Sequence, residues 1–208
     1  MSLFDIIFRR KKQTMRIVWN GHPALRKKAE AIGEITSEVL SLGEILTMSL
    51  LRSPEAGVGL AAPQIGISRR MVVIDTRPDP DDQRPTPLTP GEVVLEPLMP
   101  VVLVNPEIIS KSAATTVCSE GCLSLPGVSA KVERPAEVVV RARLLDGQEV
   151  TLSCGNLLGR CLQHEIDHLD GVLFIDHASQ EEQNAAAPQM KKLAKEEHRR
   201  YEQQKRQR

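Results

Sequence analysis

The chain of 208 residues has few aromatic side chains, which make up only 2% of its composition. Hydrophobic residues still amount to 41%, so a core of one sizeable domain has to be built from aliphatic side chains. Neither sign of charge is in excess, because 27 Lys and Arg balance 27 Asp and Glu. A net charge of zero gives no global attraction to nucleic acid, so DNA is not an expected partner.

Cysteine is scarce as well, and the four cysteines form no CxxC pair. A disulfide framework is therefore not expected, and we interpret these residues as reduced thiols in a reducing compartment. One of them is expected to bind a metal ion and the others to be buried. The four positions are Cys118, Cys122, Cys154 and Cys161.

Long hydrophobic runs are absent: no stretch approaches the roughly 20 apolar residues of a membrane-spanning helix. Residues 1–12 run from apolar to basic, the reverse of a secretory signal peptide, and Asp5 and the short length argue against an organelle presequence. We therefore expect a cytoplasmic protein in which residues 1–15 are an N-terminal extension. Such a short basic amphipathic stretch packs on the surface or contacts a partner or a membrane.

The most informative stretch is QHEIDH, residues 163–168, which contains an HExxH pattern. On a helix, His164 and His168 share a face, so both imidazoles can reach one metal ion. Glu165 then lies close enough to exchange a proton with the metal's water ligand. Two surface histidines on a charged helix are the alternative, but Leu162 and Ile166 indicate a helix inside a core. The pattern predicts metal-assisted hydrolysis of an amide or ester.

Two histidines are one ligand short, because a catalytic site of this kind takes about three protein ligands and keeps a position for water. The metzincin continuation fails, since Phe174 occupies the place of its third histidine. Glu181 or Glu182 can complete a gluzincin-like site, although their polar surroundings are typical of a solvated segment. Cys122, in the sequence EGCLSLP, is the better candidate.

A third segment, Gly57–Gly66, is rich in small residues and contains Gln64. Such a loop can lie against a substrate backbone, and the Gln64 amide can donate a hydrogen bond to a developing oxyanion. Taken alone, the segment also fits an ordinary turn between a helix and a strand.

Together the three segments resemble the peptide deformylase family, whose patterns GxGLAAxQ, EGCLS and QHExDH occur here in that order. The resemblance extends from Arg16 to His177. It implies an enzyme that removes the formyl group from the N-terminal formyl-methionine of new polypeptides and releases formate. Nascent formyl-methionyl peptides are then the expected partners.

The resemblance also implies roles for individual residues. It assigns the metal ligands to Cys122, His164 and His168. It makes Glu165 the general acid and base, with the Gln64 amide and the Leu123 backbone N–H as oxyanion donors. The implied native metal is iron(II), while zinc, nickel or cobalt remain possible because thiolate and imidazole ligands do not choose among them.

The same resemblance suggests how the peptide is bound. Gly59 is expected to contact its backbone, and an apolar slot for the methionine side chain is expected from Val58, Leu157, Cys161 and Cys118. Arg160 stands where many relatives hold an aliphatic residue. Its stem is expected to pack while its head reaches water, unless the pocket differs. Ser129 is a second departure, because some relatives have a basic residue nearby.

The expected fold is α+β, with short antiparallel strands in small sheets around a central HExxH helix at Leu157–Leu169 that Gly171 ends. Apolar spacing predicts another helix at Ile35–Arg52. Asp146-Gly147 predicts a hairpin turn. The expected strands are 70–76, 103–104, 138–144 and 149–153.

We expect a catalytic domain at residues 16–177. Within it, residues 77–100 hold seven of the 14 prolines and predict an exposed insertion or loop. Residues 178–208 are expected to form a basic C-terminal helix or tail. From Gln189 onward, eight Lys and Arg face three Glu, which predicts a solvated helix that frays at its end. The alternative is a contact with ribosomal RNA, because some deformylases dock by a C-terminal helix.

Two other classes of protein share part of this pattern. A metalloprotease would use HExxH to cleave internal peptide bonds. A metal-stabilised binding module would keep Cys122 and the two histidines but would need neither Glu165 nor Gln64. The presence of both residues favours the deformylase interpretation.

Overall fold

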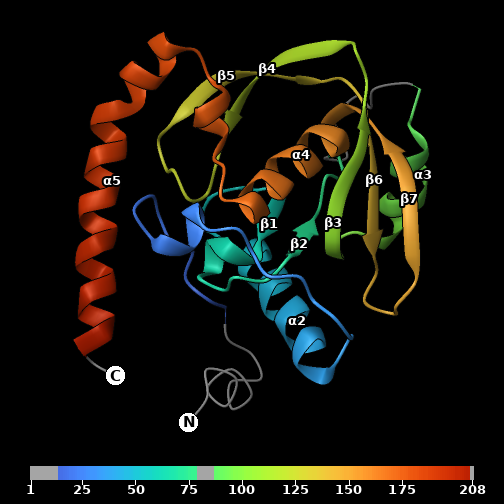
Figure 1. The fold of residues 1–208 in the computed structure, drawn as a ribbon, viewed down its shortest axis with the longest axis horizontal. Helices are drawn as coiled ribbons and strands as arrows, with labels where there is room; N and C mark the ends of the chain where they lie inside the picture. The colour runs from blue at the N-terminus through green and yellow to red at the C-terminus, as the bar shows by residue number, and fades with distance from the viewer. Residues whose placement is uncertain (1–13, 79–86, 207–208) are drawn as a thin grey trace.

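The computed structural model describes residues 14–78 and 87–206, which form two antiparallel sheets with helices packed against them (Figure 1). The larger sheet has the strand order β1-β2-β3-β6-β7. Its strands are β1 Gly59–Ala61, β2 Met71–Ile74, β3 Val101–Lys111, β6 Val138–Arg143 and β7 Glu149–Cys154. The smaller sheet pairs β4 (Thr115–Gly121) with β5 (Ser129–Pro135). The predicted α+β class with small antiparallel sheets is confirmed.

Helix α4 (Asn156–Asp170) carries the HExxH residues and lies at the centre of the molecule in Figure 1. Its apolar side chains, among them Leu158 and Leu162, are buried in one cluster with residues of the larger sheet. Gly171 ends the helix with a left-handed φ of 78°, a conformation that glycine adopts without strain. The predicted helix and its glycine cap are confirmed.

Strand β2 is buried on both faces, because alternate residues point to opposite sides of the sheet. Val72 and Ile74 pack in the cluster that contains α4. Met71 and Val73 pack with helix α2 (Ser37–Leu51). The predicted helix at 35–52 is thus confirmed with slightly shorter bounds. In the described part of the chain, four 3-10 helices connect the larger elements: η1 Pro23–Arg26, η2 Ala62–Ile65, η3 Glu96–Leu98 and η4 Phe174–His177.

The predicted hairpin turn at Asp146-Gly147 is also confirmed and joins β6 to β7. Gly147 has a φ of 90°, which a side chain would disfavour. The Leu144 N–H donates to the Gln148 carbonyl over 2.8 Å, and the Gln148 N–H donates to the Asp146 carboxylate over 2.9 Å. Both bonds hold the two strands in register.

The prediction of an exposed loop at 77–100 is wrong for its second half. Helix α3 (Pro90–Leu95) begins there, with Pro90 in its first turn. The Thr89 N–H donates to the Glu92 carboxylate over 2.7 Å, as in a capping box, and Glu92 is buried. The TxxE pattern with a proline therefore marks the beginning of a helix, although turn-forming residues surround it. Residues 79–86 of the predicted insertion lie outside the described residues.

The C-terminal helix α5 runs over Gln180–Arg206, within the predicted residues 178–208. The prediction that it is solvated is wrong for one face, which packs against residues near the start of the described chain. Leu193 and Glu197 are buried, and the Glu197 carboxylate accepts two hydrogen bonds of 2.7 Å from Arg16. The Arg200 guanidinium lies 3.8 Å from the centre of the Trp19 ring.

The predicted N-terminal extension lies almost wholly outside the described residues, and so does the amphipathic stretch at 1–12. Among the helices of 14–78 and 87–206, none is both long and apolar enough to cross a lipid bilayer.

Candidate metal centre and active site

Three side chains bring one possible ligand atom each to the same place. Cys122 follows directly after β4, while His164 and His168 lie one turn apart on α4. Their ligand atoms all lie within 4.8 Å of one another, and Cys122 Sγ lies 3.2 Å from His168 Nε2. The structure therefore brings together the three residues that were predicted as metal ligands. Glu182, one of the alternative ligands, instead accepts a hydrogen bond of 2.8 Å from the Lys131 N–H.

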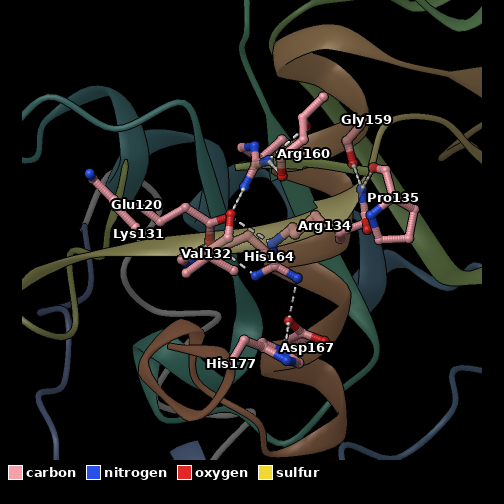
Figure 2. Close-up of polar contacts among 12 residues, drawn as sticks. Glu120, Lys131, Val132, Arg134, Pro135, Gly159, Arg160, His164, Asp167 and His177 are labelled. Carbon is pink, nitrogen blue, oxygen red and sulfur yellow. Dashed lines mark hydrogen bonds and ion pairs between the residues drawn. The ribbon is translucent and has the colours of Figure 1, made fainter. Parts of the chain in front are cut away.

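The orientation of His164 is set by Glu120. His164 Nδ1 lies 2.9 Å from a Glu120 carboxylate oxygen, which directs Nε2 toward the other two ligand atoms. Burial alone would raise the pKa of Glu120, but hydrogen bonds from His164 and Arg134 hold it well below its ordinary value. Figure 2 shows this carboxylate between the imidazole and two guanidinium groups. Sequence reasoning missed this role of Glu120, although the residue opens the EGCLS motif.

The chemistry of these groups fits a divalent transition metal. Burial lowers the pKa of His168 well below 6.5, so its imidazole is neutral, the form that binds metals. Glu165 is 4% exposed, and burial raises the pKa of its carboxyl to about 7. Within the described part of the chain, Glu165 Oε2 has no hydrogen-bond partner. A neutral imidazole, a cysteine sulfur and a buried carboxyl group with one unpaired oxygen among the described residues suit a hydrolytic metal site.

Gln64 lies beside the cluster with a fixed orientation. Its Oε1 accepts a hydrogen bond of 2.7 Å from the N–H of Ala61, the last residue of β1, which directly precedes η2. This leaves Nε2 pointing toward Cys122 Sγ at 3.4 Å and Ser124 Oγ at 3.3 Å. The amide therefore presents N–H groups, and not its oxygen, to the candidate site.

Gly59 allows β1 to approach α4 closely. A β-carbon at this position would lie 2.7 Å from both Cys161 Sγ and Glu165 Oε1. Such distances are shorter than any ordinary contact. Glycine at 59 is therefore required by the space that the Glu165 carboxylate occupies.

A cavity of about 410 Å³ opens onto these groups. Four residues that were predicted to bind substrate line it: Val58, Gly59, Leu157 and Cys161. Leu123, Gln64, Cys122, His164 and Glu165 line it as well. Cys161 is buried, and its thiol lies 3.4 Å from the Val58 carbonyl. Burial raises the pKa of this thiol well above 9.0, so it is neutral and contributes an uncharged wall.

One prediction about the pocket is wrong, and one of the two alternatives for Arg160 is ruled out. Cys118 is exposed on β4 and does not line the cavity. The head of Arg160 does not extend into water. Its guanidinium forms an ion pair with Glu120 over 2.6 Å, and the side chain is 12% exposed. Ser129 is absent from the cavity lining, which contains its neighbour Val128.

Comparison with known proteins places the chain in a family. Residues 14–184 match the family model for polypeptide deformylase. The peptide deformylase of Agrobacterium fabrum is 39% identical over 173 residues, which are 83% of this chain and 92% of the relative. Peptide deformylase 2 of Gloeobacter violaceus is 42% identical over 170 residues, or 82% of this chain and 81% of the relative.

Solved structures agree. Peptide deformylase 1B of Arabidopsis thaliana, crystallised with an inhibitor, superposes with a TM-score of 0.74 and 30% identity. The match covers 89% of this chain and 93% of that one. The chain therefore belongs to the peptide deformylase family, metal-dependent enzymes that remove the formyl group from the N-terminal methionine of new polypeptides.

Proposed function

We propose that this chain removes the formyl group with Glu165 as general acid and base beside a metal ion held by Cys122, His164 and His168. One observation supports the proposal above all others. Among the described residues, the buried Glu165 Oε2 has no hydrogen-bond partner, and Glu165 lines the same cavity as two of the three converging ligands, Cys122 and His164. A metal ion bound there supplies an activated water at neutral pH. Glu165 takes the proton of the attacking water and later delivers it to the departing amine, which is too basic to leave as an anion.

Gln64 and the Leu123 backbone N–H are proposed as donors to the oxyanion that forms when the formyl carbon is attacked. The hydrogen bond from Ala61 to Gln64 Oε1 supports this role, because it fixes the amide with Nε2 toward the cavity before substrate arrives. A preoriented donor costs no reorganisation during the reaction. One such donor typically contributes about 3 kcal/mol of barrier reduction.

The wall of the cavity supports recognition of methionine. Val58 and Leu157 contribute apolar surface that is 40% and 50% exposed, and the neutral Cys161 thiol lies between α4 and β1. We propose that these three side chains bind the methionine side chain and that Gly59 contacts the peptide backbone. A formyl carbon carries only hydrogen besides its oxygen and nitrogen. We propose that the site accepts this small group and excludes an acetyl group by size.

The experiment that tests this function compares three substrates with anaerobically purified, iron(II)-loaded protein. Formate release from formyl-Met-Ala-Ser is expected, together with no acetate release from acetyl-Met-Ala-Ser. A casein or internal-peptide substrate is expected to remain uncleaved. Cleavage of the internal bonds without formate release would show a metalloprotease instead.

Iron(II) is the proposed native metal, although thiolate and imidazole ligands also suit zinc, nickel or cobalt. An iron(II)–thiolate site is expected to lose activity in air as Cys122 oxidises. Metal analysis of protein purified without oxygen tests the assignment. Full activity with zinc alone, and no iron in that protein, would contradict it.

We further propose that the enzyme acts in the cytoplasm. We also propose that α5 contacts ribosomal RNA near the place where formylated chains emerge from the ribosome. Lys191, Lys195 and Arg199 are exposed and recur every four residues, so they form one cationic stripe. Leu193 and Glu197 are buried on the opposite side of the helix. Truncation of α5 would expose these buried groups, so charge reversal is the cleaner experiment.

The variant carries Lys191→Glu, Lys195→Glu and Arg199→Glu together. Sedimentation with ribosomes at moderate salt is expected to fall at least tenfold, while formate release from a short formyl peptide stays unchanged. Undiminished sedimentation of the variant would refute the ribosome contact.

A further inference from the structure

Arg160 joins three elements that meet at the candidate metal centre. It lies on α4 one turn before His164, and its guanidinium reaches both strands of the smaller sheet (Figure 2). Nη1 donates to Glu120 over 2.6 Å and to the Val132 carbonyl over 3.2 Å. Nη2 donates to the Thr116 carbonyl over 2.8 Å and to its hydroxyl over 3.0 Å. One side chain thus connects α4 to both β4 and β5.

The Glu120 carboxylate is the central acceptor of this network. One oxygen accepts from Arg160 Nη1 and from Arg134 Nε, both over 2.6 Å. The other accepts from Arg134 Nη2 over 3.0 Å and pairs with His164 Nδ1 over 2.9 Å. The Glu120 side chain is 5% exposed, so the guanidinium and imidazole groups provide the hydrogen bonds that water would give to an exposed carboxylate. The direction in which His164 points is therefore fixed through Glu120 by two guanidinium groups.

The proposed ligands come from two separate elements, since Cys122 follows β4 whereas both histidines belong to α4. Contacts that fix β4 relative to α4 therefore decide how closely the thiol and the imidazoles meet. Arg134 lies on β5 and links Glu120 to Asp167 of α4. Arg160 adds direct hydrogen bonds from α4 to the Thr116 backbone of β4.

We propose that Arg160 is a positioning residue that holds Glu120 and, through Glu120, His164. The metal site is then assembled before the ion binds, and the assembled site releases the ion slowly. This inference rests on the proposed metal ligands. A planar guanidinium suits the task, because it directs several donors in fixed directions, whereas a lysine ammonium is a single flexible point charge. An aliphatic residue at 160 leaves one Glu120 oxygen with one donor fewer and the Thr116 carbonyl without its partner on α4.

The test measures release of cobalt(II), whose thiolate and d–d absorption bands report an intact Cys-His-His site. Cobalt-loaded wild type and Arg160→Leu are mixed with excess chelator, and the decay of the bands gives the dissociation rate. Loss of a group that orients a ligand typically weakens a metal site by about 10–100-fold. Arg160→Leu is therefore expected to release cobalt at least tenfold faster. Arg160→Lys, which keeps the charge and a single contact, is expected to fall between the two.

A matched control is Arg141→Leu. Arg141 forms an ion pair with Glu107 across β6 and β3, and neither residue lines the cavity. Its cobalt release is expected to equal that of wild type. Circular dichroism of each metal-free variant checks that the fold is kept, and Arg160→Lys serves if Arg160→Leu does not fold.

A double-variant cycle tests whether Arg160 acts through Glu120. In a Glu120→Gln background, Arg160→Leu is expected to add less than a threefold increase in cobalt release, because the two changes disrupt one network. Equal release from wild type and Arg160→Leu would overturn the proposal, and so would equal acceleration by Arg141→Leu. A wild type that shows no thiolate–cobalt band would instead refute the proposed ligands themselves.

Discussion

Gly59 provides a sharp test of how this chain positions Glu165. A β-carbon on residue 59 would lie 2.7 Å from Glu165 Oε1 and from Cys161 Sγ, while ordinary contact begins near 3.4 Å. In Gly59→Ala these side chains must retreat by about 0.7 Å. Both are buried, so we expect the strain to be shared between the carboxylate and strand β1.

The expected cost follows from that displacement. Misplacing a catalytic group by about 1 Å can lower the rate about 100-fold, which corresponds to about 2.7 kcal/mol of lost transition-state stabilisation. Overpacking the buried site should also lower the free energy of unfolding by about 1–3 kcal/mol. We expect kcat/KM for formate release from formyl-Met-Ala-Ser to fall about 100-fold in Gly59→Ala while the metal is retained.

The control is Gly33→Ala, because a β-carbon at residue 33 meets no atom within 4 Å. This variant should keep wild-type kcat/KM and thermal stability. The reasoning is refuted if Gly59→Ala retains kcat/KM within threefold of wild type, or if both alanine variants lose activity equally.

Three further predictions concern the oxyanion donor, the docking of α5 and the metal. Gln64→Met removes the Nε2 donor and should lower kcat about 100- to 1,000-fold at unchanged metal content; a smaller loss than tenfold contradicts the proposed role. Burial opposes ionisation of Glu197, but the Arg16 guanidinium holds its pKa below the ordinary 4.5. A carboxyl whose folded pKa is lowered stabilises the fold above its unfolded pKa and loses this effect as pH falls through the folded pKa. The difference in Tm between wild type and Glu197→Gln should therefore be largest at neutral pH and shrink below pH 4.5; a constant difference contradicts this. Removal of the metal by a chelator should abolish formate release and lower Tm, since the ion binds only the folded chain, and anaerobic iron(II) should restore both; undiminished activity of metal-free protein contradicts the metal's role.

The parts of the site that could be predicted from the sequence are those carried by local patterns. The spacing of His164 and His168 predicts one helix face, because four residues make about one turn. Gly171 predicts the end of that helix. Cys122 and Gln64 lie far from α4 in the chain. Their chemistry made each a candidate, and the resemblance to a family indicated that both meet α4.

Glu120, Arg134 and Arg160 could not be grouped from the sequence. Their ion pairs join residues 14 and 40 positions apart, and no periodicity in the chain marks such a pairing. The position of the Arg160 head could not be predicted for the same reason. An arginine in an apolar pocket usually extends its guanidinium into water, unless a buried carboxylate accepts hydrogen bonds from it.

The two errors in the fold have different physical causes. Thr89 and Glu92 form a capping box that begins a helix. The prediction of a loop rested on the many prolines around them. The apolar stripe of α5 is thin, so it predicted a solvated helix. Docking of that helix depends instead on Glu197 with Arg16 and on Arg200 with Trp19, contacts that couple distant ends of the chain.

The most direct test of the account is formate release by iron(II)-loaded wild type and Glu165→Gln, measured together with the metal content of each protein. Glutamine keeps the shape of the side chain but cannot accept and return a proton at neutral pH. The account predicts rapid release by the wild type, a loss of at least 100-fold in Glu165→Gln, and equal iron content in both. Wild-type rates in a fully metal-loaded Glu165→Gln would contradict the central claim that Glu165 transfers the proton.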